Sequence, residues 1–158
     1  MKQFISSIQT AIIGTIDSSN HPFLSYAPYI YDDNYFYIYI SDIATHAKNI
    51  QANSNTSLFF TEDESKTENI FARKRISLQC VSRKIERDSS RFEEILSLFE
   101  DKFDISTVAM LKKMTDFNLY ELEVKVGEAT FGFGEAYTVG GDDMNILVPR
   151  TIGSGHRK

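Results

Sequence analysis

The sequence predicts a mainly β, α+β domain: a six-stranded antiparallel β-barrel with peripheral helices. Aromatic residues are abundant, with 12 phenylalanines and 8 tyrosines, and they gather in short alternating or β-branched stretches that suit pleated sheets. Turn-forming residues separate these stretches at short intervals, as in a strand meander. The length of 158 residues, 42% of them hydrophobic, allows one domain with a sizeable core and is too short for two.

The first half of the chain predicts a short helix followed by a meander. Spaced apolar residues within 1–9 suit an amphipathic helix. The stretch YFYIYI at 35–40 is the strongest strand signal in the sequence. A second short helix is predicted over 44–52, and the polar loop 62–69 is expected to be solvated and mobile. The predicted strands in this half are 10–16, 23–31, 35–40 and 57–61.

A long strand is predicted over 73–85. Its apolar residues Ile76, Leu78 and Cys80 alternate with polar ones, and the adjacent apolar pair Cys80 and Val81 predicts a β-bulge. Cys80 is the only cysteine, so a disulfide framework is excluded. No basic side chain is placed to activate it, and we expect a buried structural thiol.

Helices and a hairpin are predicted to complete the domain. Ser90 and Glu93 form a capping box at the start of an amphipathic helix over 90–103, and a shorter helix is expected near 106–113. A closing hairpin then joins 119–126 to 129–139 around Gly127. We therefore assign 1–143 to the barrel domain and 144–158, which has no clear periodicity, to a flexible C-terminal arm.

Composition argues against several classes of partner. The net charge of −5 disfavours a nucleic-acid partner, which would need a basic face. No apolar stretch approaches the roughly 20 residues that span a bilayer, and no signal-peptide pattern opens the chain. The expectation is a soluble, cytoplasmic protein.

Each of the three histidines has an ordinary structural explanation. His21 lies in a predicted turn and is expected at the surface. His46 opens the helix 44–52, where it could face an anion, although packing is favoured. His156 lies in a glycine-rich tail beside Arg157 and Lys158, where no packing contact evidently requires an imidazole. Its ordinary explanation is a disordered tail, because chain ends are usually mobile. The residues alone leave its role open.

Eight short motifs, in this order and spacing, carry a resemblance that covers the chain from about residue 8 to its end. They are LSYAP at 24–28, SDIATHAKN at 41–49, FARKR at 71–75, ERD at 86–88, DF at 116–117, GFGEAY at 132–137, GDD at 141–143 and GHRK at 155–158. The chain resembles the heme-utilisation proteins of HugZ/HutZ type. These are a branch of the FMN-binding split-barrel superfamily that also contains pyridoxamine 5'-phosphate oxidase.

The resemblance implies a homodimer of split barrels that binds heme in a cleft between the subunits and degrades it oxidatively. An external electron donor or reductase would be required. The GHRK motif maps the iron ligand onto His156, and the DF motif maps its hydrogen-bonding partner onto Asp116 of the other subunit. A carboxylate that accepts the second imidazole N–H fixes the tautomer of the ligand and raises its basicity. Without the resemblance, Asp116 is an ordinary turn residue before a strand.

Basic residues complete the implied site. Arg75 of the FARKR motif matches an arginine that faces the oxygen-binding side of the heme or a nearby anion. We prefer this role to that of a solvated strand arginine, because a guanidinium there could stabilise bound dioxygen or peroxide. The propionates could pair with Arg73, Lys74, Arg157 or Lys158. The candidate catalytic residues are therefore Arg75 and Asp116, and the candidate cofactor-binding residues are His156, Arg75, Arg157, Lys158 and His46.

Two alternative functions remain open. An FMN-dependent oxidoreductase is one, because the wider superfamily binds flavin in a similar cleft. The predicted strand 23–31 contains no lysine or arginine for the FMN phosphate, which disfavours this alternative. The other is a non-catalytic heme carrier or store, which would share every binding residue.

Overall fold

The structure is a computed structural model that describes residues 1–140 and 146–150 of the chain. Its elements follow one another as a short helix, a strand meander, a helical pair and a final hairpin with a short extra strand. They are α1 (Lys2–Ser6), β1 (Thr10–Ile16), β2 (Pro22–Asp32), β3 (Tyr35–Ser41), α2 (Thr45–Ala52), β4 (Asn55–Thr61), η1 (Glu64–Lys66), η2 (Ile70–Ala72), β5 (Arg75–Ile85), α3 (Ser90–Lys102), α4 (Ile105–Lys112), β6 (Phe117–Thr130), β7 (Ala136–Gly140) and β8 (Leu147–Pro149).

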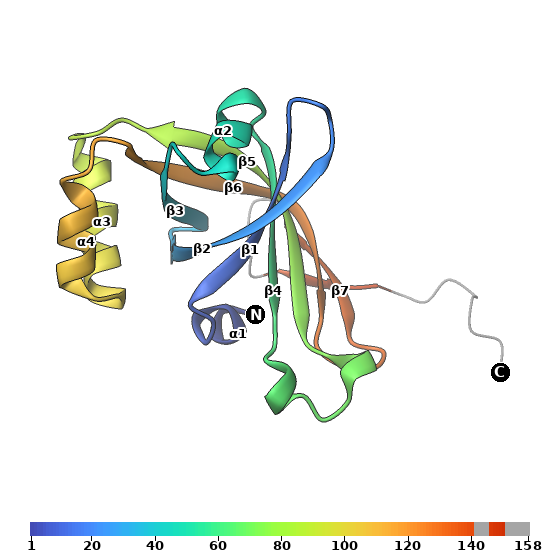
Figure 1. Ribbon diagram of the computed structural model, residues 1–158. Helices are drawn as coiled ribbons and strands as arrows, with labels where there is room; N and C mark the ends of the chain where they lie inside the picture. The colour runs from blue at the N-terminus through green and yellow to red at the C-terminus, as the bar shows by residue number, and fades with distance from the viewer. Residues whose placement is uncertain (141–145, 151–158) are drawn as a thin grey trace.

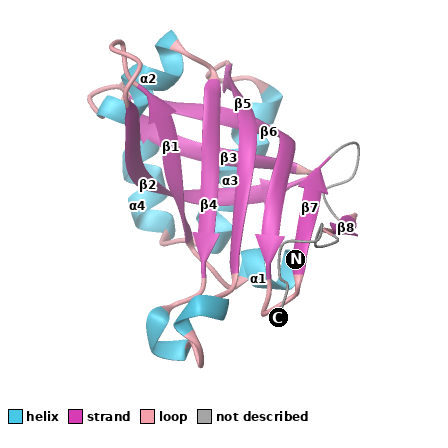
Figure 2. Cartoon of the chain, turned by 90° about the vertical axis from the view of Figure 1, so that its right-hand side faces the viewer, coloured by secondary structure: helices cyan, strands magenta, loops and turns pink. Residues whose placement is uncertain are grey.

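The strands form one antiparallel sheet that closes on itself. Its order is β3-β2-β1-β4-β5-β6-β7-β8, and the additional pairing of β3 with β6 closes the first six into a barrel. The predicted barrel is confirmed. Strands β7 and β8 extend the sheet beyond it, so 147–149, part of the predicted arm, pairs with β7. Figures 1 and 2 show α3 and α4 together on one side of the barrel, and the η1 segment beyond the far end of β4.

The interior is filled in two places. The barrel core contains aromatic and aliphatic side chains from every barrel strand, among them Tyr29, Phe36 and Phe60, whose rings contact one another. A second cluster, which includes Tyr39, Phe92 and Phe99, packs α3 against the outside of the barrel. The alternation predicted for 73–85 is observed in β5, and Cys80 is buried as expected. Burial raises the pKa of its thiol to about 12.

The predicted hairpin around Gly127 is wrong. Strand β6 runs without a break from Phe117 to Thr130, and the turn lies beyond it at 131–135, where the Phe131 N–H donates to the Glu135 carbonyl at 3.0 Å. Gly127 faces β5 so closely that a Cβ atom there would lie 2.5 Å from Leu78 Cδ2. This glycine is required by strand packing and not by a turn.

Two smaller predictions also change. The bulge lies near Cys80 as predicted, but the extra residue is Lys125 on the partner strand, because Gln79 pairs with Val126 and Cys80 with Val124. The helix cap is Ser89, whose hydroxyl accepts the Phe92 N–H at 3.2 Å, in place of Ser90.

The predicted polar loop 62–69 contains the short helical turn η1, and a second such turn, η2, follows it. None of the helices in the described ranges is long and apolar enough to cross a membrane.

Candidate functional site

Asp116 lies in the turn between α4 and β6 and is held from two directions. The Ser41 hydroxyl donates a hydrogen bond of 2.5 Å to Asp116 Oδ2, and the Asp42 N–H donates one of 2.8 Å to the Asp116 carbonyl. The side chain is only half-buried. Its second carboxylate oxygen, Oδ1, has no hydrogen-bond partner within the described ranges. The carboxylate is therefore fixed at one oxygen and able to accept a donor at the other.

Arg87 fixes the same turn from the other side. Its guanidinium donates to the carbonyls of Lys112 at 3.1 Å, Met114 at 2.9 Å and Phe117 at 2.6 Å. A planar guanidinium suits this task because its donors form a rigid fork. The backbone on both sides of Asp116 is thus anchored to the loop that follows β5.

Two exposed apolar residues belong to the segments that hold this carboxylate. Ile43, whose backbone N–H donates to Ser41 Oγ at 3.2 Å, leaves 78% of its surface exposed, and Met114 leaves 38%. Exposed apolar groups beside a half-buried carboxylate suit contact with an apolar ligand or partner.

Arg75 lies far from Asp116 in the same subunit. It is the first residue of β5, it is exposed, and it donates a hydrogen bond of 2.9 Å to the Arg73 carbonyl. It pairs with Thr130 at the end of β6, whereas Asp116 precedes the start of β6. The 11 residues of β5 separate them by roughly 30 Å along the strand. One subunit therefore does not bring these two candidate residues together.

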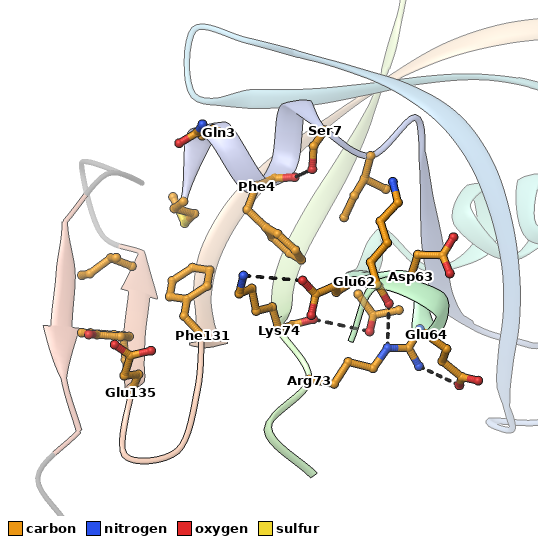
Figure 3. Close-up of a pocket in the computed structure, with 16 residues that line it drawn as sticks. Gln3, Phe4, Ser7, Glu62, Asp63, Glu64, Arg73, Lys74, Phe131 and Glu135 are labelled. Carbon is orange, nitrogen blue, oxygen red and sulfur yellow. Dashed lines mark hydrogen bonds and ion pairs between the residues drawn. The ribbon is translucent and has the colours of Figure 1, made fainter. Parts of the chain in front are cut away.

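A cavity of about 1210 Å³ opens at the Arg75 end of the barrel, between α1, the η1 segment and the β6–β7 turn (Figure 3). Phe4 and Phe131 meet edge to face within its lining. Two candidate propionate partners lie here, but both are already paired. Arg73 binds Glu64 at 2.9 Å, and Lys74 lies 3.5 Å from Glu62.

His46 is integrated into the packing between α2 and β2. Its Nδ1 lies 2.9 Å from the Ser25 hydroxyl, and the ring is half-buried. Burial holds the pKa of this imidazole below its ordinary value, because the charged form is poorly solvated. His21 is exposed, as expected, 3.7 Å from Asp17.

The predicted iron ligand His156 and its neighbours Arg157 and Lys158 lie outside the described residues, as does the GDD motif at 141–143. Across residues 1–140 and 146–150, no three His, Cys, Asp or Glu side chains are grouped as a metal site. The roles of His156, Arg157 and Lys158 therefore stay predictions.

The outer face of β1 and β2 is apolar and exposed. Leu24 leaves 71% and Tyr26 69% of its surface accessible. Tyr26 pairs across the sheet with Ile12, which in turn pairs with Phe59 of β4. An apolar row of this kind on a sheet surface favours association with another surface.

Two residues that shape the Asp116 turn had no predicted role. Ser41 and Arg87 are members of the resemblance motifs, but their partners lie 75 and about 30 positions away in the chain. The Ser41 contact depends on the pairing of β3 with β6, and the Arg87 contacts depend on the pairing of β5 with β6. Local sequence spacing carries no signal for them.

A barrel closed by the β3–β6 pairing, with helices on one side and a half-buried carboxylate before β6, defines a split-barrel protein. The chain belongs to the family described as pyridoxamine 5'-phosphate oxidase, whose sequence pattern matches residues 1–131.

Within this superfamily the chain belongs to the HutZ branch. It is 34% identical to heme oxygenase HutZ of Vibrio cholerae over the whole of this chain and 88% of that protein. The crystal structure of HutZ from Vibrio cholerae, which is called a heme storage protein, superposes on this chain with a TM-score of 0.74. The two sequences are 31% identical, and the match covers 78% of this chain and 87% of that one. Campylobacter jejuni ChuZ superposes with a TM-score of 0.85 and 30% identity over 99% of this chain and 63% of that chain.

Proposed function

We propose that this protein is a heme-binding oxygenase that degrades heme to a biliverdin-type product and releases the iron for use by the cell. The observation that carries the proposal is the full-length similarity to heme oxygenase HutZ. The geometry of Asp116 supports it, because one carboxylate oxygen is anchored and the other is able to accept an imidazole N–H.

The residues present suit a heme. Bound heme would supply both the redox-active iron that activates dioxygen and the macrocycle that is consumed. In the proposed site His156 holds the iron, and Asp116 accepts the second N–H of the imidazole. This hydrogen bond fixes the tautomer and increases the basicity of the ligand. Arg75, whose guanidinium makes one hydrogen bond in the described structure, has donors left for an oxygen ligand or a propionate.

The proposal includes a homodimer. Arg75 and Asp116 are at opposite ends of the β5–β6 ladder, so two copies packed in opposite directions would bring the Arg75 end of one subunit to the Asp116 end of the other. The exposed apolar face that contains Leu24 and Tyr26 is the surface we assign to this contact. We also place the protein in the cytoplasm, with electrons from an external donor or reductase.

Heme storage is the second candidate, because the crystal structure of the Vibrio cholerae relative carries that description. Storage and degradation share the binding residues, and they differ in whether the bound heme is consumed when electrons and oxygen are supplied. FMN binding is the third. Strand β2 contains no lysine or arginine for a phosphate, which weighs against it.

The test combines hemin binding with turnover. Purified protein titrated with hemin is expected to give a Soret band that His156→Ala weakens, whereas the exposed His21→Ala control keeps it. Ascorbate in air should then bleach the band and yield a tetrapyrrole product. A stable Soret band under these conditions favours storage, and flavin absorbance of the purified protein with no hemin binding would overturn the proposal.

A further inference from the structure

We propose that Ser41 is a positioning residue for the Asp116 carboxylate. The inference deepens the proposed function and rests on it, because it gives Ser41 an effect on heme only through Asp116. Ser41 is the last residue of β3, and Asp116 immediately precedes β6. Ser41 pairs with Phe117 where these two strands close the barrel.

The Ser41 hydroxyl has a single orientation that satisfies its neighbours. Its oxygen accepts the Ile43 N–H at 3.2 Å, and its only hydrogen is directed to Asp116 Oδ2 at 2.5 Å. A hydroxyl-to-carboxylate bond of this length is charge-assisted and stronger than a neutral hydrogen bond. Because the Ile43 N–H occupies a lone pair of the Ser41 oxygen, the hydroxyl hydrogen points to the carboxylate before any ligand binds.

This bond controls the side chain of Asp116 and not its backbone. The backbone is held separately, by the Asp42 N–H on the Asp116 carbonyl and by Arg87 on the carbonyls of Met114 and Phe117. Removal of the Ser41 hydroxyl would leave the turn in place and release the carboxylate to rotate. With the hydroxyl present, Oδ2 is held and Oδ1 is presented in one direction. Preorganised acceptors of this kind bind without the entropic cost of ordering a side chain.

A double-mutant cycle on hemin affinity separates this role from a structural one. We expect Ser41→Ala to weaken hemin binding by roughly 3- to 10-fold, because the released Asp116 side chain must then be ordered on binding. Asp116→Ala should weaken it by about 10- to 100-fold. In the Asp116→Ala background, Ser41→Ala should have no further effect, because the group that it positions is gone. The ferrous iron–histidine stretching frequency should fall in both single variants.

The chain offers a matched control in a second serine–aspartate pair. Ser106 Oγ donates to Asp104 Oδ2, also at 2.5 Å, at the start of α4. Ser106→Ala should leave hemin affinity unchanged. If Ser41→Ala fails to fold, the isosteric pair Ser41→Thr and Ser41→Val replaces it, with the hydroxyl-bearing threonine expected to bind hemin more tightly than valine.

The outcomes are distinguishable. If Asp116→Ala leaves affinity unchanged, the proposed function loses its assignment of Asp116. If Asp116→Ala weakens hemin binding but Ser41→Ala weakens it by the same factor in both backgrounds, Ser41 does not act through Asp116. The inference is also overturned if Ser41→Ala leaves hemin affinity unchanged in both backgrounds.

Discussion

Arg75 and Asp116 lie at opposite ends of one antiparallel ladder, the pairing of β5 with β6 that starts at Arg75 opposite Thr130 and ends at Ile85 opposite Leu119. Both belong to the motifs that relate the chain to heme-utilisation proteins, yet the strand separates them by roughly 30 Å of path. A site that uses both must therefore take one from each of two subunits. This geometry underlies the predictions on assembly.

The outer face of β1 and β2 is predicted to be the dimer contact. Leu24→Lys and Tyr26→Glu place charges on this apolar face and should convert the dimer to monomer, because burying an unpaired charge is strongly unfavourable. Sedimentation velocity checks the mass. Ile105→Lys, an equally drastic change at an apolar residue 63% exposed at the start of α4, is the control and should leave the dimer intact. Dimers that persist in both face variants would exclude this face as the contact.

Arg87 is predicted to stabilise the Asp116 turn. Arg87→Lys keeps the charge but replaces the planar fork, whose two terminal nitrogens reach the carbonyls of Lys112, Met114 and Phe117, with a single ammonium on a shorter side chain. We expect the free energy of unfolding in urea to fall by about 1–3 kcal/mol. Arg150→Lys, at an arginine whose side chain is 50% exposed and whose partner Glu128 is also exposed, is the control and should change it by less than about 0.5 kcal/mol. Equal effects at the two positions would contradict the role of Arg87.

His46 is predicted to make stability depend on pH. Burial lowers the pKa of His46 in the folded protein from its ordinary value of 6.5, so the unfolded chain takes up the proton more readily. The stability that neutral His46 contributes is present above pH 6.5 and is lost as the pH falls from there through the folded-state pKa. His46→Gln should flatten this decline in the free energy of unfolding, measured in urea between pH 7 and pH 5.

The control for this titration is His21→Gln, at an exposed turn residue, which should keep the full decline. An unchanged slope in His46→Gln would show that other groups cause it. Hemin affinity should still weaken on acidification in His46→Gln, because protonation of the proposed ligand His156 competes with iron.

Gly127 is predicted to be intolerant of any side chain. The Cβ of Gly127→Ala would lie 2.5 Å from Leu78 Cδ2 and 2.6 Å from the Ser77 carbonyl oxygen. Overpacking of this kind costs about 1–3 kcal/mol, which thermal unfolding would register as a lower melting temperature. Gly14→Ala is the comparison, since its Cβ would meet the Ser57 side-chain hydroxyl, which can rotate away. A melting temperature unaffected by Gly127→Ala would contradict the close strand approach.

Local patterns predicted the elements of this fold well because each has its own periodicity and turn chemistry. The bounds of β1 match the predicted 10–16, and the alternation of Ile76, Leu78 and Cys80 is buried as expected. Prediction failed at Gly127 because a glycine in a turn and a glycine under a neighbouring strand look alike in sequence. The distinction depends on Leu78, almost 50 residues earlier in the chain.

The site was predictable only in part, for a similar reason. Asp116 and Arg75 are candidate site residues through motif resemblance alone, and no local pattern predicts that they lie at opposite ends of the β5–β6 pairing. The hydrogen bond from Ser41 to Asp116 requires β3 to pair with β6, and the three bonds from Arg87 require β5 to pair with β6. Their physical basis is tertiary.

Hemin titration of a mixed dimer tests whether each proposed heme site combines His156 of one subunit with Asp116 of the other. Differently tagged His156→Ala and Asp116→Ala subunits are co-expressed, and the heterodimer is purified. We expect one site of wild-type affinity per heterodimer, because both substitutions fall together in the other site. A heterodimer with no site better than those of the two parent variants would contradict it.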